Sequence, residues 1–112
     1  MSEHIMARKF REYRLAKTGN PQVVHMPDGS VVISVVARDA ALWLTALVDV
    51  DAHAVPVQFY VLAGWDDLPD GIPLSFVGTA MDLISGIGQP AVHDVRHVFQ
   101  VHPQPLMTVR LR

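Results

Sequence analysis

The chain has 112 residues, of which half are apolar and 18% are charged, and its formal net charge is −2. This length fits one domain that has a core of its own. The absence of cysteine excludes disulfides, thiolate metal sites and cysteine nucleophiles. Residues 1–6 lack the apolar segment of a signal peptide, and no apolar run reaches the ~20 residues that span a bilayer. We therefore expect a cytoplasmic protein without membrane contact.

Short apolar runs separated by turns predict β-strands. Alternating or β-branched side chains favour strands over residues 9–16, 22–26, 31–38, 41–50, 57–63, 74–79 and 91–101. Turn residues such as Pro27-Asp28-Gly29-Ser30 separate the runs. Six to eight strands spaced about ten residues apart are typical of a small antiparallel β-sandwich or barrel-like domain.

The pattern also predicts several local features. Both faces of residues 41–50 are largely apolar, which indicates a central strand covered on both sides. Residues 51–54 read as a loop, and residues 80–85 allow one helical turn. We expect one β domain over residues 8–102, with an N-terminal extension at 1–7 and a C-terminal arm at 103–112.

Charge is distributed unevenly along the chain. Residues 8–17 hold five cations and one Glu, a balance of +4, whereas residues 18–92 hold one Arg and eight Asp, a balance of −7. Such polarity can guide association between protomers or with an anionic partner. Cations along a strand also protect a sheet edge, so both interpretations stay open.

Aromatic and basic residues provide the parts of a site for a small anionic nucleotide. An Arg guanidinium matches phosphate geometry, and an aromatic ring can stack on a base. Core packing is the commoner use of such aromatics. Because the aromatic middle of the chain is acidic, long nucleic acid is disfavoured as a ligand. The candidate ligand-binding residues are Arg8, Arg11, Arg14, Trp43, Tyr60, Trp65, Arg96 and His97.

Signals for catalysis or metal binding are weak. On a strand His93 and His97 lie about 13 Å apart, too far for one ion. Asp66, Asp67 and Asp70 lack the regular spacing of a calcium loop. The Gly86-x-Gly88 step resembles half of a phosphate-binding nest, but it belongs to no recognised nucleotide motif. No serine lies in a GxSxG elbow. We expect no catalytic residue, no metal and no cofactor.

The order of several short motifs resembles a small all-β domain family of unknown function that is common in bacteriophage and prophage proteins. The resemblance spans roughly residues 8–101. The matching steps are Lys9, Tyr13-x-Leu15, Met26-Pro27-x-Gly29, Ile33-x-x-Val36, Leu42-Trp43, Ala46-Leu47-Val48-Asp49, Phe59, Gly64, Leu68-Pro69, Phe76-Val77-Gly78-Thr79 and His97-Val98-Phe99. It implies phage origin and expression inside a bacterium, and it implies no particular activity.

These observations together predict a phage-encoded, non-catalytic binding protein. We expect a homo-oligomer, because apolar residues on both faces of the central strand exceed what one small core uses. A counter-defence role, by sequestering a nucleotide signal or by inhibiting a host immune protein, is one concrete form of this hypothesis. The alternatives are a structural or accessory phage component and a small hydrolase.

Overall fold

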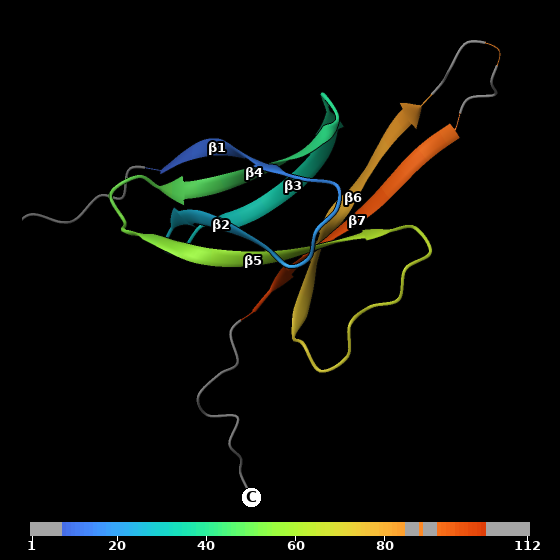
Figure 1. Cartoon of the computed structure of the whole chain (residues 1–112). Helices are drawn as coiled ribbons and strands as arrows, with labels where there is room; N and C mark the ends of the chain where they lie inside the picture. The colour runs from blue at the N-terminus through green and yellow to red at the C-terminus, as the bar shows by residue number, and fades with distance from the viewer. Residues whose placement is uncertain (1–7, 85–87, 89–91, 103–112) are drawn as a thin grey trace, which may run out of the picture.

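The computed structural model describes residues 8–84, 88 and 92–102. Within them, seven antiparallel strands form two sheets and no helix is present (Figure 1). One sheet has the order β1-β4-β3 and consists of β1 (Arg8–Leu15), β4 (Ala41–Asp49) and β3 (Val31–Arg38). The other has the order β2-β5-β7-β6 and consists of β2 (Gln22–Pro27), β5 (Ala54–Ala63), β7 (Val92–Val101) and β6 (Leu74–Ile84). The predicted all-β fold is confirmed, as a small sandwich.

The core lies between the two sheets, where alternate residues of each strand meet. On β4, the side chains of Leu42, Leu44, Ala46 and Val48 are fully buried. Leu42 and Leu44 pack in one cluster with Leu15, Met26, Val35, Phe59, Val61, Ala80 and Val98. The side chains of Trp43, Thr45 and Leu47, which alternate with the buried ones, stay partly exposed. The prediction that β4 is covered on both sides is therefore wrong for the described part of the chain. The four-stranded sheet packs against one face of β4, and no described strand covers the other face.

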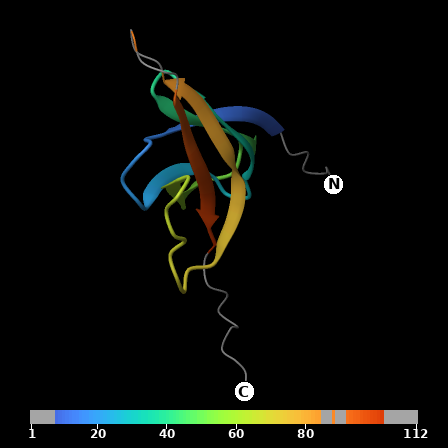
Figure 2. The same ribbon diagram turned by 90° about the vertical axis from the view of Figure 1, so that its right-hand side faces the viewer.

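The β6–β7 hairpin is longer than the sequence pattern indicates and extends past the rest of the sandwich (Figures 1 and 2). Residues 80–84 pair with residues 92–96 of β7. The predicted helical turn at 80–85 is therefore wrong over its described part, since hydrogen bonding to β7 replaces a weak local helical preference. Gly86 of the possible phosphate nest lies outside the described residues, as do the predicted extension at 1–7 and the arm at 103–112.

Two local features connect the remaining strands. Asp39 and Ala40 both have positive φ, 54° and 61°, and close the tight β3–β4 turn between the paired residues Arg38 and Ala41. The Asn20 side chain donates to the Val61 carbonyl and accepts from the Val61 N–H, both at 2.7 Å, which attaches the β1–β2 loop to β5. β5 itself starts at Ala54, so residues 51–54 are a loop only up to residue 53.

Candidate functional site

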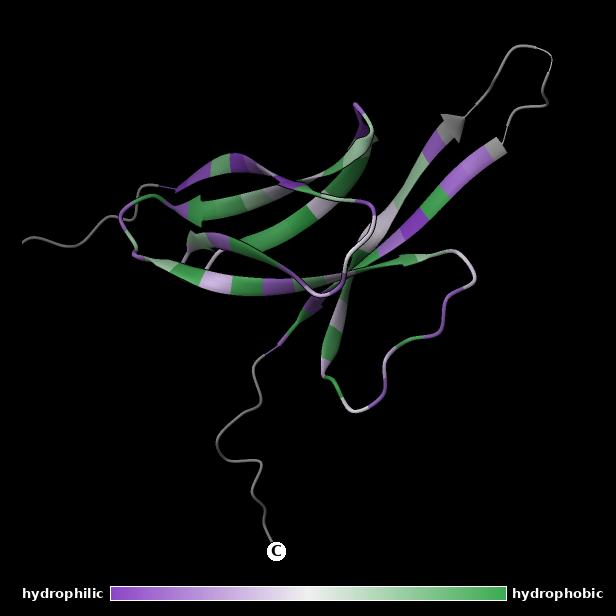
Figure 3. Cartoon of the chain, in the orientation of Figure 1, coloured by the Kyte–Doolittle hydropathy of each residue, from purple (hydrophilic) through white to green (hydrophobic). Residues whose placement is uncertain are grey.

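The outward side of the three-stranded sheet carries exposed apolar side chains, and Figure 3 shows apolar residues along its strands. Directly paired residues of an antiparallel sheet share a face. Phe10 pairs with Leu47, and Leu47 pairs with Val31, so the three form a row opposite to the buried positions of β4. Phe10 is 69% exposed. We define the outer apolar face as Phe10, Trp43, Leu47, Val31, Val36 and the bulge residue Ile33.

Charged side chains border this face at one end. The Arg38 guanidinium lies 4.8 Å above the Trp43 ring and donates to Glu12 at 2.9 Å. The Trp43 Nε1–H donates to the Arg38 carbonyl at 3.2 Å. Arg14 pairs with Trp43 in the β1–β4 ladder and shares its face, whereas no ion pair engages Arg14 or Arg8 within the described part of the chain. These two arginines are therefore available to a partner.

The opposite side of β1 presents a second pair of cations. Lys9 pairs with Val48 and Arg11 pairs with Ala46, so both side chains share the face of the buried β4 residues. They nevertheless remain exposed, since β1 is the edge strand of its sheet. The structure thus separates the predicted site residue Arg11 from Arg8 and Arg14, which point to the other side of the strand.

Arg96 belongs to a partly buried charge cluster that attaches the β1–β2 loop to the β6–β7 hairpin. The Lys17 ammonium donates to Asp94 at 2.9 Å and to Asp82 at 3.4 Å. Arg96 donates to the other oxygen of Asp94 at 2.8 Å and to the Lys17 carbonyl at 3.0 Å. The hydrogen bond from Lys17, followed by that from Arg96, holds the pKa of Asp94 below its ordinary value, and the same contact with Asp94 raises the pKa of Lys17. Arg96 is therefore neutralised inside the protein.

Tyr60 and His97 lie on the outward face of the four-stranded sheet. Tyr60 pairs with Phe99, and His97 pairs with Thr79 of β6, whose Oγ1 lies 2.8 Å from the His97 Nδ1 atom. Phe99 in turn packs against Phe76, with the ring centroids 5.4 Å apart. This face is the side of the sandwich away from Trp43, Arg8 and Arg14.

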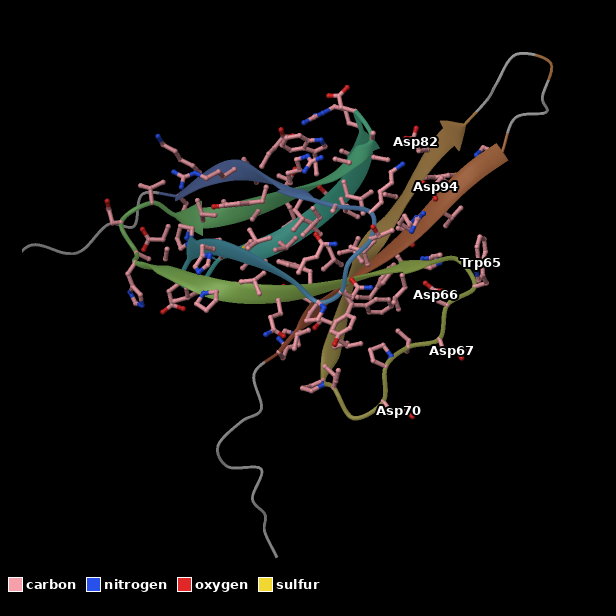
Figure 4. The ribbon with its side chains drawn as sticks, in the orientation of Figure 1. Trp65, Asp66, Asp67, Asp70, Asp82 and Asp94 are labelled. Carbon is pink, nitrogen blue, oxygen red and sulfur yellow. The ribbon has the colours of Figure 1, made fainter. Side chains whose placement is uncertain are left out.

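Trp65 begins the loop of residues 64–73, which connects β5 to β6, and its side chain is 87% exposed (Figure 4). Asp66 accepts a hydrogen bond from the Ala63 N–H at 2.8 Å and so closes the turn that follows β5. Asp67 and Asp70 are exposed, and no ion pair engages either one among the residues described. The loop combines an exposed aromatic ring with negative charge.

The eight candidate residues therefore do not converge on one pocket. Arg8, Arg14 and Trp43 share the outward side of the three-stranded sheet, Tyr60 and His97 share the outward side of the other sheet, and Arg11, Arg96 and Trp65 lie in separate places. A cavity of about 390 Å³ lies elsewhere and is lined by residues 27–30, 55–58 and 100–101. Asp28 is its charged residue, which disfavours an anionic ligand there.

Groups that could perform catalysis or hold a metal are also dispersed. No cluster of three His, Asp or Glu side chains suited to a metal ion occurs in the described segments. Ser75 Oγ contacts His102 Nε2, which resembles half of a nucleophile–base pair. Within the same segments no carboxylate hydrogen-bonds to the His102 or His97 ring to orient it. This arrangement supplies no catalytic triad.

The outer apolar face and the charge cluster were both missed by the sequence reading. The β-branched run at 31–38 indicated a strand without showing that Val31, Ile33 and Val36 lie on its exposed side. Lys17 lies 65 and 77 positions from its partners Asp82 and Asp94, so no local spacing could reveal the cluster.

Comparisons with protein-family models, with curated proteins and with solved structures give no match. In the described residues there is no helix long and apolar enough to cross a membrane.

Proposed function

We propose that this chain is a phage-encoded, non-catalytic binding protein that works as a homo-oligomer inside a bacterial host. The observation that carries the proposal is the outer apolar face. Phe10, Val31, Ile33 and Val36 are all exposed there, together with the partly exposed Trp43 and Leu47. These side chains lie in two cross-strand rows, with the polar Thr45 and Ser34 between the rows. Exposed apolar side chains with a charged border are typical of protein-interaction surfaces.

The dispersion of the candidate residues favours a protein partner over a nucleotide. A nucleotide site needs cations and aromatic rings that point into one hollow. Arg96 is instead engaged with Asp94, and Tyr60 and Trp43 lie on opposite outward faces. In this proposal a counter-defence role takes the form of binding a host protein and not of sequestering a nucleotide.

Light scattering and calorimetry test the proposal. We expect the purified chain at micromolar concentration to show a mass that is a multiple of 12.4 kDa. A monomer over the whole micromolar range would contradict the oligomer. Titration with cyclic and linear nucleotides should give no binding heat, whereas saturable heat would favour nucleotide sequestration instead. Pull-down from a lysate of infected cells, with Phe10→Asp as the control variant, would then identify the partner.

A further inference from the structure

We propose that the outward side of β1 docks the 64–73 loop of a second copy, so that copies of this chain assemble head to tail. This inference rests on the homo-oligomer of the proposed function and names its contact. The two surfaces are complementary in charge, and each also has an exposed apolar centre.

The basic surface consists of Arg8, Phe10 and Arg14. These residues alternate along β1 with Lys9, Arg11 and Tyr13, and therefore share the outward side of the strand. Arg8 lies two residues before the exposed Phe10 and Arg14 lies four residues after it. Glu12 lies between Phe10 and Arg14 on the same side and forms its ion pair with Arg38, and Asp49 is the cross-strand neighbour of Arg8. No ion pair within the described residues neutralises Arg8 or Arg14. Protection of a sheet edge explains the charge of β1, but it does not explain an exposed phenyl ring between the charges.

The acidic surface consists of Trp65, Asp67, Leu68 and Asp70. Trp65 and Leu68 are both exposed, and they are the largest apolar side chains that the loop presents to solvent. Figure 4 shows Asp67 and Asp70 along the loop beyond the sheet. This surface therefore offers negative charge and an aromatic anchor, which match the positive charge and the phenyl ring of β1.

β1 and the 64–73 loop lie on different sides of one protomer, as Figures 1 and 2 show, so the two segments are apart within one copy. A symmetric contact between two β1 strands would bring the arginines of both copies together, and a symmetric contact between two loops would bring their aspartates together. Both arrangements are repulsive. Attraction requires the β1 surface of one copy against the loop of the next, a heterologous contact that generates a ring or an open filament.

Two variants test this contact. Arg8→Glu/Arg14→Glu reverses the charge of the basic surface, and Asp67→Arg/Asp70→Arg reverses that of the acidic surface. Asp66 stays unchanged because its carboxylate closes the turn after β5. Lys9→Glu/Arg11→Glu is the matched control, because it makes the same change in charge on the same strand but on the opposite side. Circular dichroism checks that each variant is folded.

Mass measurement by light scattering gives the decisive result. Each reversal variant alone should be a monomer, the control should assemble like the wild type, and an equimolar mixture of the two variants should assemble again. Assembly returns because the unchanged loop of one variant fits the unchanged β1 surface of the other, and the reversed charges of the two variants also attract each other. Variants that assemble normally, or a mixture that stays monomeric, would overturn the head-to-tail contact while the oligomer itself stands. A monomeric wild type would overturn both proposals.

Discussion

Replacing Lys17 with Met should destabilise the attachment of the β6–β7 hairpin to the sandwich. Asp82 and Asp94 are direct cross-strand partners, and like charges in that position repel each other. Lys17 relieves this repulsion from the β1–β2 loop, with hydrogen bonds of 2.9 Å to Asp94 and 3.4 Å to Asp82. The substitution leaves Arg96 as the remaining cation of the cluster.

The magnitude follows from the two contacts that are lost. The Lys17 and Asp94 side chains are 19% and 14% exposed, so their charge-assisted hydrogen bond contributes about 1.5–3 kcal/mol. Asp82 is more exposed, so its longer contact adds about 0.5 kcal/mol at most. The apolar stem of Met keeps part of the packing of Lys17. We therefore expect Lys17→Met to lower the free energy of unfolding by about 2 kcal/mol near neutral pH.

The loss should depend on pH in a defined direction. The pKa of Asp94 is lowered in the folded protein, mainly by Lys17 and then by Arg96. Its stabilising contribution is therefore present above the unfolded-state pKa and disappears as the pH falls through the lower folded-state pKa. The pKa of Lys17 is raised above its ordinary value of 10.5, so its contribution disappears only as the pH rises through that higher value. The effect of Lys17→Met should thus be full near neutral pH and shrink in acid.

Urea unfolding followed by circular dichroism measures this effect at one fixed protein concentration. The wild type, Lys17→Met, Asp94→Asn and the double variant form a cycle whose coupling energy isolates the pair. Lys9→Met is the control, because Lys9 is exposed and forms no ion pair among the described residues. The reasoning would be refuted if Lys17→Met cost no more than Lys9→Met, or cost as much at about pH 2 as at about pH 7.

Three further predictions concern local features, and urea midpoints measure the stability change in each. Ala40→Gly should stabilise the protein by about 0.5–1 kcal/mol because Ala40 has positive φ, and a lower midpoint would contradict the strain. Asn20→Ala should cost about 2 kcal/mol through two lost hydrogen bonds to Val61, and an unchanged midpoint would refute that attachment. Arg96→Met should lower the free energy of unfolding by about 1.5–3 kcal/mol, because it removes the ion pair with Asp94. Arg14→Met should change the free energy of unfolding little but weaken assembly, because Arg14 faces outward. The reverse pattern would contradict the roles assigned to the two arginines.

The strands and the fold class could be predicted because their signals are local. Alternation, β-branched runs and the Pro27-Asp28-Gly29-Ser30 turn depend on neighbours in the sequence, and they placed most strand ends within two residues of the observed ones. The prediction of a helical turn at 80–85 was wrong because these residues have no strong local preference for helix or strand. Their conformation is decided by pairing with residues 92–96, on the other side of the hairpin.

The coverage of β4 could not be predicted for a similar reason. The sequence shows that both faces are apolar, but it does not show how many layers the fold supplies. Leu44 is fully buried because the four-stranded sheet lies beneath it, whereas Leu47 stays partly exposed because none of the seven described strands covers the other side. The excess of apolar residues that suggested an oligomer therefore lies on the outer apolar face, which includes Phe10 and Leu47.

Arg14 and Arg96 show why the candidate site could be predicted only in part. In sequence they are equivalent, since each is a cation in an alternating strand. In the fold, Arg96 meets Asp94 on its own strand and the Lys17 carbonyl from a distant loop, so its charge is used to hold the hairpin. Arg14 faces outward beside Trp43, on a strand that forms the edge of its sheet among the described residues. Tertiary pairing therefore decides which cations remain for a partner, and it leaves those of β1 opposite in sign to the 64–73 loop.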